Sequence, residues 1–220
     1  MSNLITLESL DVDGAIRESA EGVPEATRAD FLKKAALGGG ALIGGGAVLT
    51  GFPAIATAGR PSKNQDVAIL NFALTLEFLE AEFYIEALRD ANLTGDVLQT
   101  TRIVTAHEKT HVKTLKRALG GRAVKKPRFD FRNTTQDAAV FLDTAVVLED
   151  TGVAAYSGQA ARVFQPAVLK TAASILAVEA RHASRFRSLN GQNFAPDAFD
   201  PRKSMSAVLR AVKKTRFIKP

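Results

Sequence analysis

The spacing of hydrophobic and polar positions takes on a helical period after Ser62. Between residues 65 and 90, apolar side chains recur every three or four positions, which is the spacing of one helix face. Residues 95–119 continue this type of pattern and are followed by two consecutive glycines, which commonly terminate helices. The pattern therefore predicts two long helices joined by a short turn.

Two further helices are predicted in the second half of the chain. Residues 122–132 have mixed charge and contain a proline, so we expect a loop there. The polar residues 134–137 are suited to cap a third helix that runs to about Phe164. Pro166 is a favourable first residue for a fourth helix, which we expect to end at Leu189.

The whole pattern predicts an all-α fold, since no segment keeps the two-residue period of a strand for long. The loop at residues 122–132 is long enough to be the crossover of a four-helix bundle, between helices two and three. Asp200 and Pro201 are predicted to start a short, basic, amphipathic C-terminal helix. We therefore expect a bundle over residues 61–192 and a basic C-terminal extension over residues 193–220.

Residues 1–60 differ in composition and are interpreted as a flexible N-terminus with an export signal. Basic side chains at residues 28–34 precede an uncharged run, residues 35–58, which is rich in Gly and Ala and closes with small residues. This order is typical of a cleaved signal. We expect cleavage near Ala56 or Ala58 and an exported mature protein, periplasmic or extracellular. The alternative is a membrane anchor, because the run is long enough to span a bilayer.

Polar residues inside the four predicted helices repeat. A Glu followed by a Tyr seven positions later, and then a Glu followed by a His three positions later, occurs twice. The first copy comprises Glu77, Tyr84, Glu108 and His111, and the second comprises Glu149, Tyr156, Glu179 and His182. The copies are offset by 71 or 72 positions, which indicates an internal duplication.

The repeated spacing has a chemical reason. Residues three apart lie on one helix face, so a Glu and a His can hold one metal ion together. Four carboxylates that meet in an apolar core would repel one another, and two divalent cations would remove that cost. One Glu from each of two helices and a Glu-x-x-His from each of two others is the ligand set of di-iron and di-manganese bundles. The pattern predicts a site for two Fe ions, or two Mn ions, with a metal-free polar network as the alternative.

Tyr84 and Tyr156 are the candidate catalytic residues. Each lies two helical turns from a predicted ligand and on the same face, so it points into the same core. We expect these tyrosines to hydrogen-bond to ligands or to donate electrons. Ordinary packing in an amphipathic core is the alternative interpretation.

Other polar side chains lie close to the repeat in sequence. His107 is expected to point away from the ligand face, either at the surface or behind a ligand. Arg181 is expected either to orient a carboxylate or to form a surface ion pair. Glu80, Glu82 and Glu86 are expected on a solvated helix face.

Composition and charge narrow the range of functions. The chain has no cysteine, which excludes disulfides, Cys-ligated zinc, iron–sulfur clusters and thiol catalysis. The formal net charge is +6, and the segment after residue 200 is the most basic part. Such a segment either contacts nucleic acid or an anionic membrane, or forms an ordinary solvated surface.

The run from Leu76 to Tyr84, with the duplicated ligands, resembles the ferritin-like superfamily over residues 65–190. The chain is most similar to its secreted bacterial branch and to plant desiccation-related proteins. Residues 27–33 resemble a twin-arginine signal, although Ala29 stands where the second arginine would be. The resemblance implies one set of metal ligands: Glu77, Glu108, His111, Glu149, Glu179 and His182. Which of the carboxylates bridge the two ions stays open.

The resemblance also implies a class of chemistry. Ferritin-like sites with two metal ions react with dioxygen or peroxide, so we expect ferroxidase- or peroxide-type redox chemistry in stress protection, as in a di-iron oxidoreductase. A non-catalytic structural bundle of the desiccation-related type is an alternative. A basic module that contacts DNA or a membrane is another. Whether the chain forms a homodimer stays open.

Overall fold

The computed structural model describes residues 61–219, and the predictions for residues 1–60 lie outside this range. The described part is helical, as predicted. Its elements are α4 (Lys63–Asp90), α5 (Gly95–Leu119), the short 3-10 helix η1 (Gly120–Arg122), α6 (Ala138–Gln159), the 3-10 helix η2 (Ala160–Arg162), α7 (Pro166–Leu189) and α8 (Met205–Thr215). Four long helices and a short C-terminal one confirm the predicted fold class.

Local sequence signals set the ends of the helices. The Oγ atom of Ser62 accepts a hydrogen bond from the amide of Gln65 and caps α4, and Asp137 accepts from two amides at the start of α6. Side-chain acceptors at this position satisfy amides that have no partner within the helix. Helix α5 ends at Leu119, and the next residue, Gly120, has a φ of 56°, in the left-handed region that glycine adopts without strain.

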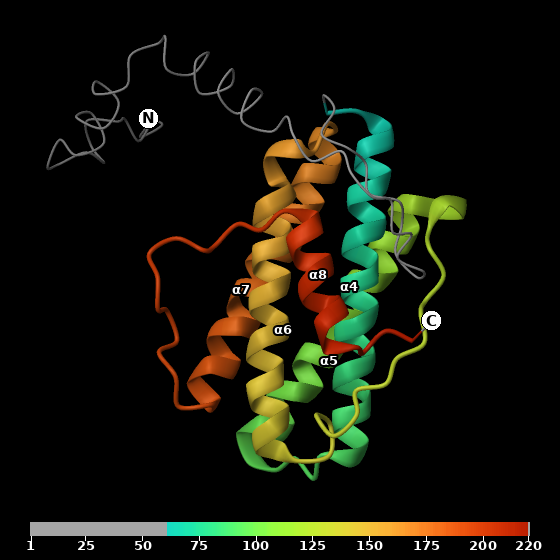
Figure 1. Cartoon of the computed structure of the whole chain (residues 1–220). Coiled ribbons are helices and arrows are strands. Elements are labelled where there is room, and N and C mark those ends of the chain that lie inside the picture. Colours follow the sequence, from blue (N-terminus) through green and yellow to red (C-terminus); the bar gives the residue numbers. More distant parts are fainter. Residues whose placement is uncertain (1–60, 220) are drawn as a thin grey trace, which may run out of the picture. The chain divides into compact units, whose positions relative to one another are not determined.

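The long helices pack as two hairpins. Helix α4 packs mainly against α5, and α6 packs mainly against α7. Between the hairpins, the chain from Ala123 to Asp137 runs the length of the bundle, so α6 points in the same direction as α5 and opposite to α4 (Figure 1). This connection is the predicted crossover between helices two and three, and it lets all four helices contribute to one core.

The crossover is held at both ends by α4. The side-chain amide of Asn71 donates to the carbonyl of Arg122 and accepts from the amide of Val124. At the other end, the buried hydroxyl of Thr135 donates to Glu86 across 2.6 Å. These bonds satisfy polar groups that the connection would otherwise bury without partners.

The predicted end of the third helix, at about Phe164, is wrong by more than one turn. Helix α6 ends at Gln159, and a 3-10 turn follows. The buried carboxylate of Asp66 on α4 accepts from the amides of Phe164 and Gln165, at 2.7 and 2.9 Å. These amides are therefore capped by a side chain and not by the preceding helical carbonyls, which allows the chain to turn into α7.

The C-terminal helix starts at Met205, four to five residues after the predicted start at Asp200 and Pro201. The segment before it is fixed on α6, because the amide of Lys203 donates to the carbonyl of Ala154. Gly158 makes room for this contact, since a Cβ atom there would overlap the carbonyl of Lys203. Ser204 then caps α8 with its hydroxyl oxygen.

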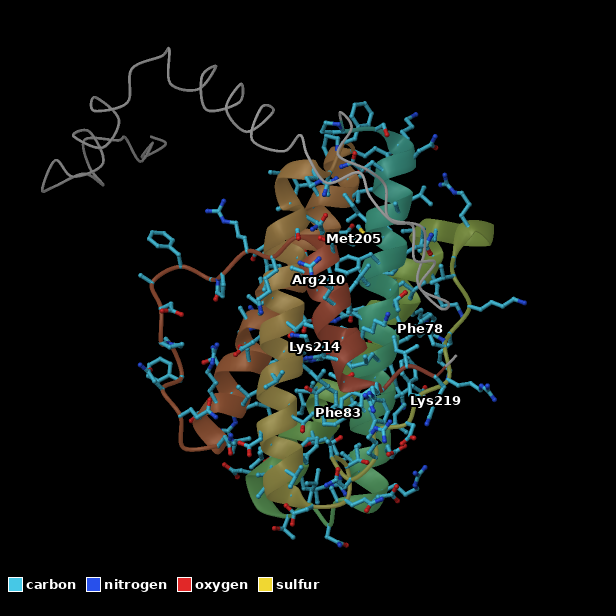
Figure 2. All side chains as sticks on the ribbon, viewed as in Figure 1. Phe78, Phe83, Met205, Arg210, Lys214 and Lys219 are labelled. Carbon is cyan, nitrogen blue, oxygen red and sulfur yellow. The ribbon has the colours of Figure 1, made fainter. Side chains whose placement is uncertain are left out.

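Helix α8 is amphipathic, as predicted, and its apolar face is part of the bundle core. Met205, Val208, Leu209 and Val212 are buried in the same apolar cluster as side chains of α4 and α6. Basic side chains, among them Arg210 and Lys214, lie on the exposed side (Figure 2). Because the apolar face is already covered, any contact of α8 with nucleic acid or lipid would have to be electrostatic.

Two apolar clusters fill the bundle. One contains Phe83, Tyr84 and Phe141, and the other contains Phe78 and Tyr156. Phe78 and Phe83 lie at different heights along α4 (Figure 2). The Glu and His residues of the repeat are also buried in the bundle. None of the helices in the described part of the chain combines the length and apolar character needed to cross a membrane.

Candidate metal centre

The structure brings all six predicted ligands together in the middle of the bundle. Glu77 comes from α4, Glu108 and His111 from α5, Glu149 from α6, and Glu179 and His182 from α7. They form two overlapping groups, and within each group the possible ligand atoms lie within 4.8 Å of one another. One group is Glu77, Glu108, His111 and Glu179, and the other is Glu108, Glu149, Glu179 and His182.

Glu108 and Glu179 belong to both groups, so their carboxylates lie at the junction of the two groups. Glu77 and Glu149 each belong to one group and face one histidine. Sequence left the bridging pair open, because the spacing along each helix does not determine how the four helices meet. All four carboxylates are 0% exposed.

Each histidine directs its Nδ1 atom at three carboxylates. Nδ1 of His111 lies 3.2 Å from oxygens of Glu77 and Glu108 and 3.0 Å from Glu179 Oε1. Nδ1 of His182 lies 3.1 Å from Glu108 Oε1, 3.4 Å from Glu149 and 3.7 Å from Glu179. The two histidines thus have equivalent positions in the two copies of the repeat.

The two tyrosines contact the carboxylates of the opposite copy. Tyr84 on α4 donates a hydrogen bond to Glu149 on α6, and Tyr156 on α6 donates to Glu77 on α4. Helices α4 and α6 are antiparallel, so the tyrosines approach the site from its two ends along the bundle axis (Figure 1). The prediction that they hydrogen-bond to ligand residues agrees with this geometry.

The carboxylates differ in their electrostatic surroundings. Burial, followed by the nearby charges of Glu179 and Glu108, raises the pKa of Glu77 well above its ordinary value. The pKa of Glu149 is raised in the same way, by burial and then by Glu179. Burial would also raise the pKa of Glu108, but contacts with His111 and His182 lower it to about 2.

Both histidines hold a proton in this environment. Burial alone lowers the pKa of an imidazole, but the short contacts of His111 with Glu108, Glu179 and Glu77 raise its pKa to about 12. Contacts with Glu108, Glu149 and Glu179 raise the pKa of His182 to about 12 as well, against the effect of burial. In the metal-free protein, the two positively charged imidazolium groups therefore compensate part of the negative charge of the surrounding carboxylates.

The hydrogen-bond pattern of the site fits a metal centre better than a closed polar network. Several buried donor and acceptor atoms have no hydrogen-bond partner in the described part of the chain: Glu108 Oε1, Glu149 Oε2, both oxygens of Glu179, and His182 Nδ1. His182 Nδ1 is close to Glu108 Oε1 but is not aligned with it for a hydrogen bond. Buried polar atoms are rarely left unsatisfied, and cations between these oxygens and nitrogens would satisfy all of them.

The prediction of a solvated face is wrong for Glu80. Glu80 is only 3% exposed, and burial, followed by the charges of Glu179 and Glu149, raises its pKa well above its ordinary value. Glu82 is partly exposed and forms an ion pair with Lys126. The signal available in the sequence was the three-residue spacing from Glu77, which places Glu80 on the ligand face of α4.

The other two polar residues near the repeat differ in their contacts. His107 is exposed, and its ring stacks on that of His182, with 2.9 Å between His107 Nδ1 and His182 Nε2. It therefore lies behind a predicted ligand, which was one of its two expected positions. Arg181 is exposed and forms no ion pair with the residues that the structure describes, so neither expectation for it agrees with the structure.

Comparison with known proteins supports the fold. A search among curated proteins found no match. A family profile described as "Ferritin-like domain" matches residues 65–192, which extend from the first turn of α4 to just beyond the end of α7. This range is more than half of the chain and contains every residue of the duplicated pattern. The chain therefore belongs to the family of ferritin-like domain proteins.

Proposed function

We propose that this protein binds two iron or manganese ions and uses them in ferroxidase- or peroxide-type redox chemistry that protects against stress. The observation that carries the proposal is the set of buried oxygens and one nitrogen that lack hydrogen-bond partners in the middle of the bundle. They belong to the duplicated Glu and Glu-x-x-His residues, whose donor atoms fit two adjacent cations.

The six residues have distinct tasks in this proposal. Glu108 and Glu179 would bridge the ions, because both belong to each group of potential ligands. Glu77 with His111, and Glu149 with His182, would each complete the coordination of one ion. Four carboxylates and two neutral imidazoles around two divalent ions make a neutral unit, which suits a buried position.

Tyr84 and Tyr156 hold the outer carboxylates in place. Their pKa values are raised well above the ordinary value, first by burial and then by the adjacent carboxylates, so both phenols keep their protons at neutral pH. Each phenol donates to a single carboxylate oxygen, which leaves the other oxygen free for a cation. Electron donation by these phenols is the second part of the role that we assign to them.

Bound iron or manganese would supply the electrons, or accept them, in a reaction with dioxygen or peroxide. The protein contributes a site whose carboxylates are fully buried, so the bulk solvent does not compete for them. His182 is connected to the surface by its contact with the exposed ring of His107. This side of the bundle, between α5 and α7, is where we place the approach of ions and protons.

The proposal includes export of the mature protein, as expected for the secreted, desiccation-related branch of the family. Support comes only from the sequence of residues 28–58, with its basic start and small-residue end. N-terminal sequencing of the mature protein would find a start after Ala56 or Ala58. Recovery of uncleaved protein in membranes would favour an anchor.

Metal analysis combined with oxygen consumption tests the function. Protein purified without added metal should contain about two Fe or Mn ions per chain. Addition of ferrous iron to the metal-free protein should consume dioxygen faster than the same solution without protein. The double variant His111→Ala/His182→Ala is the control, since it removes one ligand from each group. Metal binding without any oxygen or peroxide consumption would instead favour the structural, non-catalytic role.

A further inference from the structure

A groove lies between the α4–α5 hairpin and the start of the crossover. Its volume is about 580 Å³, within the range of about 300–1,000 Å³ that is typical of sites for small organic molecules. Its lining comes from α4, from α5 and from residues 123–126 of the crossover. None of the six residues of the candidate metal centre lines it, so the groove is a separate feature of the fold.

The floor of the groove is apolar. Phe78 and Ala81 of α4 are almost fully buried there, and the partly buried side chains of Ile85, Val112 and Val124 complete the apolar surface. A concave surface of this kind favours a ligand with an apolar body, because contact removes apolar area of both partners from water.

The rim of the groove is basic. It carries four lysines: Lys109, Lys116, Lys125 and Lys126. Lys126 pairs with Glu82, the acidic residue of the lining, across 2.7 Å. The other three are exposed and form no ion pair or hydrogen bond with the residues that the structure describes. Four positive charges and one negative charge leave the lining at +3, which favours an anion as the ligand.

Bonds between the crossover and α4 fix the shape of the groove. The amide of Val124 donates to Asn71 across 2.8 Å, and the ammonium group of Lys126 donates to Glu82 across 2.7 Å. Lys125 lies between these two fixed points in the chain. A site that is formed before its ligand arrives loses less conformational freedom when the ligand binds.

The other half of the repeat has an ion pair at the corresponding place. With the offsets of 72 and 71 positions, Phe78 corresponds to Asp150, and Lys116 corresponds to Arg187. Asp150 and Arg187 form an ion pair at 2.6 Å. The ring of Phe78 offers no such acceptor, so Lys116 keeps an unpaired charge beside an apolar surface. The α4–α5 half thus differs from the α6–α7 half by the two features that an apolar anion requires.

We propose that this groove binds an organic anion, a molecule with an acidic group on an apolar body. The apolar body lies against the floor at Phe78 and Ile85, and the acidic group interacts with the unpaired lysines of the rim. A fatty acid and an aromatic acid share this chemistry. The inference goes beyond the proposed function, because it concerns residues that the metal centre does not use.

The test uses anilinonaphthalene sulfonate, an apolar anion whose fluorescence increases when it leaves water. The full-length, metal-free wild type should bind this probe saturably. Lys116→Glu should weaken the binding by about fivefold or more, because it replaces an attraction with a repulsion. Lys113→Glu is the matched control, since it makes the same change of charge at an exposed lysine of α5 that does not line the groove. The control should bind the probe as the wild type does.

Ile85→Asp tests the floor of the groove. It places a negative charge against the apolar body of the probe, so it should abolish binding. Ile103→Asp is its control, at an isoleucine of α5 that is 50% exposed and lies outside the groove. This control should leave the affinity for the probe unchanged.

Displacement of the probe identifies the source of the anion. Displacement by octanoate assigns the groove to aliphatic acids, displacement by naphthoate assigns it to aromatic acids, and displacement by both shows that it accepts either. Octanol, which has the same apolar body as octanoate but no charge, should displace the probe far less well than octanoate does.

Three results would overturn the inference: no saturable binding by the wild type, no displacement by either acid, or equal displacement by octanol and octanoate. Equal weakening by Lys113→Glu and Lys116→Glu would overturn it as well, since the overall charge of the protein would then attract the probe. Circular dichroism checks that each variant is folded. If Ile85→Asp does not fold, the comparison of the two lysine variants decides.

Discussion

Tyr156 on α6 donates a hydrogen bond to Oε1 of Glu77 on α4, across 2.5 Å, and both side chains are buried. Tyr84 makes the reciprocal bond, from α4 to Glu149 on α6. Each copy of the repeat therefore holds a carboxylate of the other copy in position. The bonds connect two helices that make few other close contacts, because α4 packs mainly on α5 and α6 mainly on α7.

Removing one of these hydroxyl groups should destabilise the metal-free protein. We expect Tyr156→Phe to lower the free energy of unfolding by about 1–3 kcal/mol, the usual cost of leaving a buried acceptor without its hydrogen-bond partner. Urea unfolding at neutral pH measures the change. A double-mutant cycle with Glu77→Ala, which removes the acceptor, provides the control, and a coupling energy of zero would contradict the contact.

The stability of the metal-free protein should fall as pH rises. The pKa values of His111 and His182 are raised from 6.5 to about 12, and those of Glu77 and Glu149 are also raised. The folded state therefore binds more protons than the unfolded chain, and each extra proton lowers the free energy of unfolding by about 1.4 kcal/mol per pH unit. The stabilising effect of the histidines is complete below pH 6.5 and is lost as pH rises towards 12.

Melting temperatures of the metal-free and metal-loaded proteins between about pH 5 and 8 test this expectation. Bound cations replace the protons, so the loaded protein should be more stable and nearly independent of pH near neutrality. Glu108 has the opposite effect on the pH dependence of stability, because its pKa is lowered to about 2. Its stabilising contribution to the folded state is lost as pH falls from 4.5 towards 2. Identical pH profiles for the two forms would show that these carboxylates hold no metal.

Metal binding should release protons. At pH 7 both His111 and His182 are protonated in the metal-free protein, and a metal ligand must be a neutral imidazole. We therefore expect about two protons, or more, to be released when both ions bind at pH 7. Calorimetry in two buffers of different ionisation enthalpy gives this number. His182→Ala should reduce it by about one, and a release of zero would contradict the charge state of the histidines.

His107 should fix the orientation of His182. Its Nδ1 atom lies 2.9 Å from His182 Nε2, on the side of the ring opposite to the carboxylates. Partners of this kind typically change metal affinity by about 10–100-fold when they are removed. His107→Ala should weaken the ion beside His182 and leave the other ion unchanged, as measured by calorimetry. Arg181→Ala is the matched control, because Arg181 is exposed and close in sequence but forms no ion pair in the described part of the chain.

The helices and the candidate ligands could be predicted from sequence because both depend on local spacing. Gly120 and Pro166 mark helix ends by their own backbone preferences, and the structure has helix ends there. The ligand residues repeat at three-residue and seven-residue spacings, which fix the face of the helix whatever it packs against. This information is contained in each segment alone, so no knowledge of the tertiary structure was needed.

The features that sequence reasoning missed depend on contacts between distant segments. Helix α6 ends early because Asp66, almost a hundred positions away, accepts hydrogen bonds from the amides that follow. Glu80 is buried because Gly152 leaves space for it on the neighbouring helix. The start of α8 is set by the contact of Lys203 with Ala154. No pattern within any of these segments predicts its partner.

The sharing of Glu108 and Glu179 between both ligand groups has an evolutionary consequence. Each half of the chain, α4 with α5 or α6 with α7, supplies a Glu and a Glu-x-x-His, yet neither half has the ligands for a complete group. The arrangement is that of a symmetric dimer of helical hairpins whose two subunits have become one polypeptide. Fusion frees the halves from identity, because a substitution now changes only one of them. Two identical subunits would carry the same residue at these two corresponding positions, so they could not place a glutamate, Glu80, opposite a glycine, Gly152.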